Sequence, residues 1–226
     1  MTSEPRAYRR DDVASDEVAG HALSACRPVS GRTRGIRESQ GWCRARLRRL
    51  RVVAGEFKGR RLAAPPRRSA AVRPTADRVR EALFAILGEV GGASVLDLYC
   101  GTGALGIEAL SRGAGHATLV DTHVSLARRN VRELGLERRV KVVRSDALRY
   151  LRRSRRRFDL IFCDPPYRLA DRLEGELDSL IPGRLAEGGR LICESAARHP
   201  LELSLPLDAE RRYGDTLIRI HRGAGG

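Results

Sequence analysis

One short segment of the sequence places a carboxylate next to two prolines and an aromatic ring. This segment, Asp164-Pro165-Pro166-Tyr167, follows the apolar run FDLIFC. The prolines fix the path of the loop and leave the carbonyl of Pro165 without a competing local donor. The Asp164 carboxylate and this carbonyl can both accept hydrogen bonds from one amino group, and Tyr167 offers a flat face for a stacked base. A rigid surface turn is the alternative, because proline and aspartate are common in turns.

Such a pair of acceptors would matter for an amino group on a nucleic-acid base. The nitrogen of that group is a poor nucleophile, because its lone pair is delocalised into the ring. Two acceptors draw the nitrogen towards tetrahedral geometry and localise the lone pair, so that it can attack an electrophile. The segment therefore predicts chemistry at the exocyclic amine of an extruded base.

A glycine-rich turn, DLYCGTGALG from Asp97 to Gly106, precedes this segment in the chain. Glycines let a backbone turn sharply and approach a ligand closely. The spacing of Gly101, Gly103 and Gly106 is compatible with a nicotinamide dinucleotide. The acid at position 97 favours a different ligand, because it would repel a pyrophosphate and suits the cationic methionine part of S-adenosylmethionine.

Four aspartates fall at the carboxyl ends of successive apolar runs, namely Asp97, Asp121, Asp146 and Asp164. In a parallel sheet these ends line one edge, where ligands bind. Four acids at one edge suit a sulfonium cofactor with a hydroxylated ribose and an adenine amine. The alternative is that each acid caps the helix that follows, which is plausible for Asp121 and Asp146 individually.

The elements that must position these residues alternate between strand and helix. Strands are expected at 94–99, 116–121, 139–146, 158–164 and 189–195, and helices near 104–112, 123–135, 146–153 and 171–181. This order is typical of a doubly wound α/β domain with a mostly parallel, Rossmann-like sheet covered on both faces. The final run, 213–222, is expected to be a last strand, antiparallel at an edge.

A small hairpin and a helix are expected before this core. The hairpin has strand-like runs around Val52-Val53 and Arg61-Leu62. The helix should start near Pro74, with Thr75 as its N-cap, and should end at Gly88. Its buried stripe should comprise Val79, Leu83, Ile86 and Leu87, with Arg78, Arg80 and Glu81 off that stripe.

The net charge of +15 favours a polyanionic partner, although a highly charged surface without a specific partner is also consistent with it. Residues 1–50 lack periodicity and are expected to be a mostly disordered basic tail that is dispensable for catalysis; the catalytic domain is expected at 51–226. No cysteine spacing fits a zinc site, and no apolar run is long enough to span a membrane. The basic residues expected to grip nucleic acid are Lys58, Arg60, Arg61, Arg73, Arg78 and Arg80.

Four segments together resemble one family: RVVAGEFKGRRL, RPTADRVREALF, LDLYCGTGALGIEALSRGA and FCDPPY. They are similar to the bacterial 16S ribosomal RNA guanine-N2 methyltransferases of the RsmD type, and the resemblance covers about residues 51–222. The combination of RPT-x-DRVRE with DPPY is quite specific, whereas DPPY alone is shared with DNA adenine methyltransferases.

The resemblance implies the class I S-adenosylmethionine-dependent methyltransferase fold and a role for each matching position. The turn from Asp97 to Gly103, which includes Tyr99 and Gly101, would hold the methionine end of the cofactor. Asp121 would bind the ribose hydroxyls, and Asp146 would accept from the adenine amine, with Ala147 contributing backbone. Asp164 to Tyr167 would bind the target guanine, and the RPT-x-DR segment would close over the cofactor and guide RNA. Asp121-Thr122-His123 departs mildly from the family, which often has Glu followed by a charged residue.

These observations predict a cytoplasmic, monomeric enzyme that acts on 16S ribosomal RNA or an assembling small ribosomal subunit, without a metal or a membrane. Three alternatives remain open. A DNA adenine-N6 methyltransferase would usually carry a larger target-recognition insertion. An NAD-dependent oxidoreductase is disfavoured by Asp97 and by DPPY. A non-catalytic RNA-binding protein on a degenerate fold is disfavoured by the intact Asp164.

Overall fold

The computed structural model describes residues 50–65, 77–166 and 170–223. All of them belong to one compact unit that begins at Arg46. The expectations for residues 1–49, for Thr75 as an N-cap, and for the side chains of Arg73 and Tyr167 lie outside the described residues.

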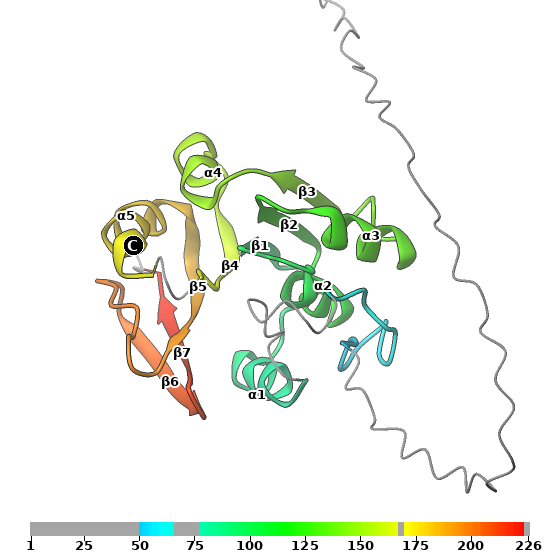
Figure 1. The fold of residues 1–226 in the computed structure, drawn as a ribbon, viewed down its shortest axis with the longest axis horizontal. Coiled ribbons are helices and arrows are strands. Elements are labelled where there is room, and N and C mark those ends of the chain that lie inside the picture. The colour runs from blue at the N-terminus through cyan, green and yellow to red at the C-terminus, as the bar shows by residue number, and fades with distance from the viewer. Residues whose placement is uncertain (1–49, 66–76, 167–169, 224–226) are drawn as a thin grey trace, which may run out of the picture. The chain divides into compact units, whose positions relative to one another are not determined.

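A seven-stranded sheet with the order β3-β2-β1-β4-β5-β7-β6 forms the centre of this unit (Figure 1). The five parallel strands are β1 (Ser94–Leu98), β2 (His116–Asp121), β3 (Val140–Arg144), β4 (Phe158–Cys163) and β5 (Leu185–Ala196). Two antiparallel strands complete it, β6 (Leu207–Tyr213) and β7 (Thr216–Arg222). The chain order reverses between β1 and β4, and ligands bind at such a switch point in open α/β sheets.

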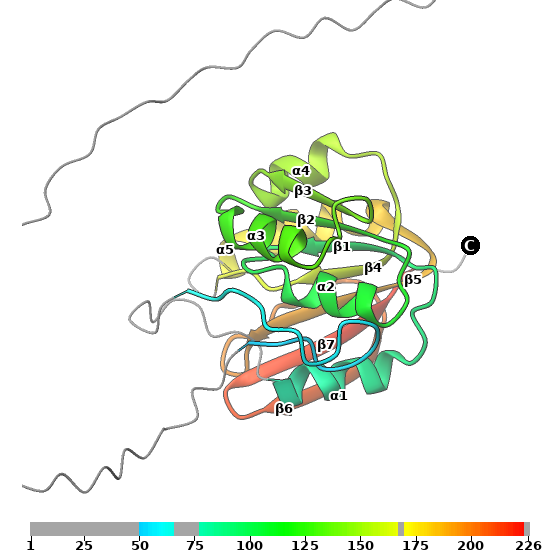
Figure 2. The ribbon, with the colours of Figure 1, turned by 90° about the vertical axis from the view of Figure 1, so that its right-hand side faces the viewer.

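Helices cover both faces of the sheet (Figures 1 and 2). One face carries the hairpin, α1 (Asp77–Leu87), α2 (Ala104–Ser111) and α3 (Ser125–Glu133). The other carries α4 (Ala147–Arg153) and α5 (Ala170–Leu180), and the short helix η1 (Pro182–Arg184) leads into β5. The fold is therefore the doubly wound, mostly parallel α/β sheet that the alternation of elements predicts, and it has the architecture of the class I S-adenosylmethionine-dependent methyltransferases that the resemblance implies.

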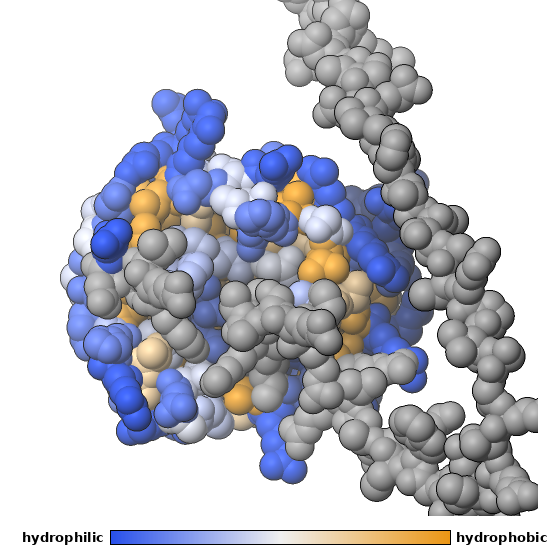
Figure 3. Space-filling view, in the orientation of Figure 1, coloured by the Kyte–Doolittle hydropathy of each residue, from blue (hydrophilic) through white to orange (hydrophobic). Residues whose placement is uncertain are grey.

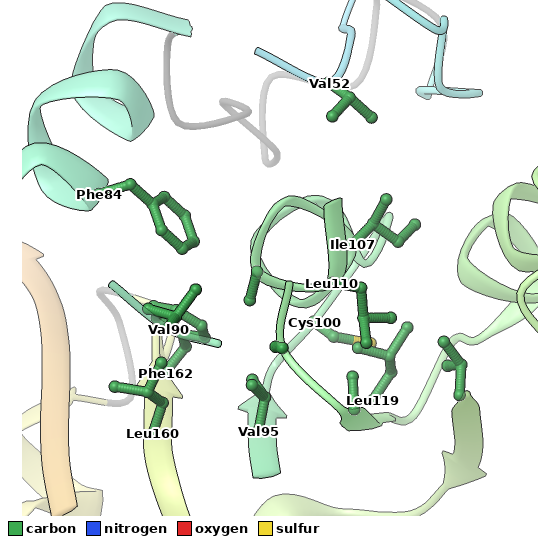
Figure 4. Packing of buried hydrophobic residues seen from close by; sticks show 14 of the residues in the cluster. Val52, Phe84, Val90, Val95, Cys100, Ile107, Leu110, Leu119, Leu160 and Phe162 are labelled. Carbon is green, nitrogen blue, oxygen red and sulfur yellow. The ribbon is translucent and has the colours of Figure 1, made fainter. Parts of the chain in front are cut away.

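The strands divide their side chains between two cores. On β4, Leu160 and Phe162 pack in the core under α1, α2 and α3, whereas Ile161 and Cys163 pack in the core under α4 and α5. This is the two-residue periodicity of a strand buried on both faces. In Figure 4 the ring of Phe84 on α1 points towards Phe162, and the two ring centroids are 5.9 Å apart.

The predicted N-terminal hairpin is confirmed, and Leu50 takes part in it. Arg51 pairs with Arg61 in an antiparallel bridge, and the N–H of Leu62 donates to the carbonyl of Leu50 at 2.9 Å. Leu50 is itself buried, as are Val52 and Leu62. Figure 4 shows Val52 on the side of α2 that carries Ile107. The hairpin therefore belongs to the core that supports the glycine turn.

Two sequence expectations about the last strands and α1 are wrong. The final strand, β7, does not lie at an edge, because β6 pairs with its outer side. The sequence of β6, LDAERRY, has little apolar periodicity because its side chains are largely exposed, so it gave no strand signal.

Arg80 is buried at 0% exposure, although its charge and its position in the helical pattern placed it off the buried stripe. Its guanidinium is accommodated because it donates to the carbonyl of Arg51 and pairs with Asp77 at 2.8 Å.

Within the described ranges, no helix has both the length and the apolar character needed to cross a membrane.

Candidate cofactor and base-binding site

The strand register brings the predicted acids to one edge of the sheet. Leu98 at the end of β1 is level with Val120 on β2 and with Cys163 on β4. Asp121 therefore ends β2, and Asp164 follows β4, at the same edge. The parallel pairing of β2 with β3 places Asp146 just beyond this edge as well. The prediction that the carboxyl ends gather these acids is confirmed.

Asp97 supports the glycine turn from inside the protein. The side chain is 2% exposed, and its Oδ2 accepts a hydrogen bond from the N–H of Gly106 at 3.0 Å. Gly103, the N-cap of α2, supplies no side-chain acceptor, so Asp97 satisfies a donor in the first turn of that helix. Burial raises the pKa of Asp97 to about 7; the hydrogen bond from Gly106 opposes the rise, and the charge of Asp121 adds to it.

Asp121 connects the turn after β1 to the end of β2. Its Oδ2 accepts from the N–H of Gly101 at 2.9 Å, and its Oδ1 accepts from the N–H of His123 at 2.8 Å. The carboxylate is only partly buried; Oδ1 also accepts from the Thr122 hydroxyl at 3.4 Å, whereas Oδ2 keeps its second lone pair. Asp121 can therefore hold the turn in place and still accept from ribose hydroxyls.

The turn itself adopts backbone conformations that L side chains rarely take. Tyr99 has φ 59°, and it is the one residue other than glycine with positive φ in the described part of the chain. Gly101 has φ 52°, and a Cβ built on it would meet nothing within 4 Å, so it faces open space where a ligand can approach. A Cβ on Gly106 would lie 2.4 Å from the side chain of Leu119, so this glycine serves close packing. The left-handed conformation of Tyr99 costs roughly 1–2 kcal/mol, and such strain clusters at functional sites.

The hydroxyl of Tyr99 is buried and has no hydrogen-bond partner among the residues that the structure describes. Burial raises the pKa of Tyr99 above its ordinary value, and the neighbouring Cys163 and Asp146 raise it further. A buried hydroxyl of this kind usually finds an acceptor or donor. It is consistent with the prediction that the turn from Asp97 to Gly103 contacts a ligand.

Asp146 is the N-cap of α4. Its Oδ1 accepts from the N–H of Arg149 at 3.0 Å, so the helix-capping interpretation holds for this residue. The side chain is exposed, and the cap uses one of its two oxygens. Ala147 follows as the first, buried residue of the helix. A second role for Asp146 towards an adenine amine stays a prediction.

Asp164 differs from the other three acids because no described residue donates a hydrogen bond to it. It is partly buried, and it accepts no hydrogen bond from any residue within the described ranges. Burial raises its pKa well above the usual range, and the charges of Glu194 and then Asp97 raise it further. Pro165 beside it is buried and Pro166 is exposed. The first part of the DPPY segment thus places at the ligand-binding edge a carboxylate that accepts no hydrogen bond from the described residues.

Sequence reasoning missed one acid near the site and two buried polar residues that support it. Glu194 lies on β5 at the same edge as Asp164, and the signal that identified the four aspartates, an acid at the end of an apolar run, also applies to it. Glu108 and Asn130 are both 0% exposed and had no comparable signal. Asn130 joins the hairpin to the turn, since it accepts from Ala63 N–H at 2.6 Å and donates to the carbonyl of Thr102 at 2.9 Å.

The basic residues predicted to grip nucleic acid separate into two groups. Lys58, Arg60, Arg61 and Arg78 are exposed. Arg80 is buried among its partners and is not placed to reach a phosphate, which corrects its assignment to this surface. Strongly hydrophilic side chains also gather on the surface over α3 and α4 in the view of Figure 3.

The raised pKa of Asp97 leads to a prediction about stability. A carboxyl whose pKa is higher in the folded than in the unfolded chain stabilises the fold at low pH, and this contribution is lost as pH rises from about 4 to about 7. Asp97→Asn keeps an oxygen for the Gly106 N–H but does not ionise. Over that window the variant should gain stability relative to the parent by up to roughly 1.4 kcal/mol for each unit of pKa difference. Urea unfolding at pH 5 and pH 8 measures this, and an equal difference at both pH values would contradict it.

Known proteins share this arrangement along most of the chain. Residues 50–222 match the family model described as Conserved hypothetical protein 95. The chain is 38% identical over 180 residues to Ribosomal RNA small subunit methyltransferase D of Escherichia coli (strain K12), covering 76% of this chain and 89% of that protein. It is 35% identical over 195 residues to YlbH of Bacillus subtilis (strain 168), covering 78% of this chain and 100% of that protein.

A solved structure gives the same result. The protein yhhF from Escherichia coli matches with a TM-score of 0.67 at 31% identity, covering 79% of this chain and 99% of that one. The family match, the relatives and the shared fold agree with the resemblance seen in the sequence motifs. The chain therefore belongs to the Conserved hypothetical protein 95 family, the family of the RsmD-like methyltransferases.

Proposed function

We propose that this chain transfers a methyl group from S-adenosylmethionine to the exocyclic N2 amine of a guanine in 16S ribosomal RNA. The observation that carries the proposal is the partly buried Asp164 carboxylate, which accepts no hydrogen bond from the described residues and stands next to Pro165 at the ligand-binding edge. The small-subunit RNA is supported by the name of the Escherichia coli relative. The choice of guanine rests on the resemblance of the motifs and on the chemistry of the edge.

The residues present fit S-adenosylmethionine. The open space at Gly101 lies beside Asp121, which accepts from the Gly101 N–H, so a cationic amino-acid moiety is favoured there over a pyrophosphate. Asp121 can accept from the ribose hydroxyls, and the second oxygen of Asp146 can accept from the adenine amine. When bound, the cofactor supplies an electrophilic methyl group on a positively charged sulfur, so that the N–C bond forms as the C–S bond breaks.

The chain itself orients the amine and removes its proton. Asp164 and the carbonyl of Pro165 accept the two amine hydrogens, which localises the nitrogen lone pair towards the methyl group. After transfer the nitrogen sheds a proton, and the Asp164 carboxylate is placed to take it. Its raised pKa suits a group that must hold a proton briefly. Positioning of this kind can contribute roughly 7–11 kcal/mol.

The proposal is tested by the identity of the product. We expect 16S RNA, either free or within small-subunit particles, to gain N2-methylguanosine at one position when it is incubated with the full chain and S-adenosylmethionine. Nuclease digestion and mass spectrometry identify the modified nucleoside. Methylation of DNA adenine, or of another atom of the RNA, would refute the proposed function.

Asp121 gives a test of the cofactor site. Asp121→Ala removes the acceptor for Gly101 N–H and the proposed acceptor for the ribose, so binding of S-adenosylmethionine should weaken by about ten- to a hundredfold. Calorimetry measures the affinity, and Asp208→Ala on β6, away from this edge, is the matched control. Unchanged affinity in Asp121→Ala, or preferential binding of NAD, would contradict the assignment.

The exposed basic residues of the hairpin give a test of RNA binding. Each phosphate contact makes the logarithm of the affinity fall by about 0.7 to 0.9 per log unit of salt. Replacing Arg60 and Arg61 together by Ala should therefore flatten the salt dependence of binding to 16S RNA. Arg211 and Arg212 on β6 are exposed and serve as the control pair. If the Arg60/Arg61 variant keeps the parent slope, the RNA lies elsewhere.

A further inference from the structure

Glu194 lies on β5, the strand next to β4, near the position where β4 ends and Asp164 follows. β4 and β5 are parallel partners, and Cys163 on β4 is level with Cys193 on β5. The residues that follow them, Asp164 and Glu194, are therefore also level. They are separated by about one strand spacing, roughly 4.8 Å between backbones.

Glu194 projects to the face of the sheet that carries α1, α2 and α3. Side chains alternate along a strand, and on β5 Ile192 packs in the core under α1, α2 and α3, whereas Cys193 packs in the core under α4 and α5, so Glu194 returns to the side of Ile192. Asp164 is the first residue after β4, and the charge of Glu194 raises its pKa, which is consistent with the two carboxylates lying close together.

The hydrogen-bonding edge of guanine matches this set of acceptors. Guanine carries three hydrogens on two neighbouring nitrogens, two on the N2 amine and one on N1. The protein offers the Asp164 carboxylate, the Pro165 carbonyl and the Glu194 carboxylate. If the first two accept the amine hydrogens, as the proposed function requires, the third acceptor faces the N1 position.

We infer that Glu194 selects guanine by accepting a hydrogen bond from its N1–H, an inference that rests on the proposed function. Adenine and cytosine also carry an exocyclic amine, but the ring nitrogen beside it has a lone pair instead of a hydrogen. A carboxylate facing that lone pair is repelled and loses its donor. Because a polar group left unpaired in a desolvated site is costly, such a site rejects the wrong base strongly.

The inference predicts a change in base specificity that a general loss of activity or stability would not produce. The base 2-aminopurine keeps the N2 amine of guanine but has an unprotonated N1. Glu194→Gln replaces an acceptor by a side chain that can donate to that N1. We expect the variant to lose at least about tenfold in kcat/KM on guanine RNA and to raise the ratio of 2-aminopurine to guanine methylation at least about tenfold.

The experiment uses the full chain and 16S RNA in which the mapped target position carries guanine or 2-aminopurine. Glu194→Asp, which keeps the charge but shortens the reach, should lose activity on guanine without gaining activity on 2-aminopurine. Glu187→Gln changes an exposed residue at the opposite end of β5 and should match the parent on both RNAs. Melting curves and cofactor affinity show that each variant is folded.

The outcomes separate the two proposals. A parent protein that methylates no guanine refutes the proposed function, and this inference with it. A parent that methylates guanine, together with a Glu194→Gln variant of unchanged base ratio, refutes only the role of Glu194. If Glu194→Gln does not fold, Glu194→Asp decides: unimpaired guanine activity, or a gain on 2-aminopurine, refutes the inference.

Discussion

Asp164→Ala should lower the rate of methyl transfer by roughly a thousandfold or more, because alignment and activation of the amine fail together. Binding of S-adenosylmethionine should stay nearly intact, since Asp164 makes no hydrogen bond within the described part of the turn that holds the cofactor. Single-turnover methyl transfer to 16S RNA measures the rate, and calorimetry measures the affinity. Asp164→Asn keeps one acceptor oxygen without the charge and should retain more activity than Asp164→Ala.

The stability of the same variants distinguishes a catalytic Asp164 from a residue that only shapes a turn. Burial disfavours the ionised form of Asp164, as its raised pKa indicates, so its charge does not stabilise the fold at neutral pH. Removing the carboxylate should therefore leave the melting temperature of the protein unchanged or slightly higher. A lower melting temperature combined with full specific activity of the folded fraction would show that the DPPY segment is only a rigid turn.

Glu108→Ala should lower the free energy of unfolding by about 3–5 kcal/mol, the largest effect on stability that we expect from a single substitution in this protein. The Glu108 carboxylate is 0% exposed and accepts hydrogen bonds from the N–H groups of Val53 at 2.7 Å and Ala54 at 3.0 Å. It also pairs with Arg112 at 2.9 Å. The variant leaves two backbone donors and a guanidinium without their acceptor, and each unsatisfied donor costs about 1–3 kcal/mol.

Urea unfolding measures this effect, and Glu81→Ala is the matched control. Glu81 is exposed on α1, and a surface substitution of this kind usually changes stability by less than about 0.5 kcal/mol. The expected loss has a structural reason, because Glu108 on α2 holds the hairpin against the core. A loss below about 1 kcal/mol in Glu108→Ala would mean that the hairpin is held mainly by its apolar contacts.

The sequence alone determined the order of the elements and the edge at which the site forms. An apolar run with β-branched residues indicates a strand from the local sequence alone, and each of the five predicted parallel strands is present. The acids at the ends of those runs had to meet, because parallel strands share one carboxyl edge. The DPPY segment and the glycine turn could also be interpreted from the sequence, since their chemistry depends on residues that are neighbours in the chain.

The tertiary structure decided the features that depend on residues far apart in the chain. Arg80 is buried because the carbonyl of Arg51 and the carboxylate of Asp77 receive its guanidinium, and a helical pattern contains no information about the first of these partners. Glu108 and Asn130 are buried because they satisfy backbone groups of the hairpin. A polar side chain can be buried when its hydrogen bonds are made, and only the folded chain shows whether they are.

The same distinction between local and long-range information applies to Asp164 and Glu194. The sequence identified Asp164 from the residues beside it. Glu194 also follows an apolar run, but only the pairing of β4 with β5, a long-range contact, places it beside the end of β4 that Asp164 follows. The proposal that the enzyme selects guanine rests on this long-range pairing and on the Asp164 carboxylate, which accepts no hydrogen bond from the described residues.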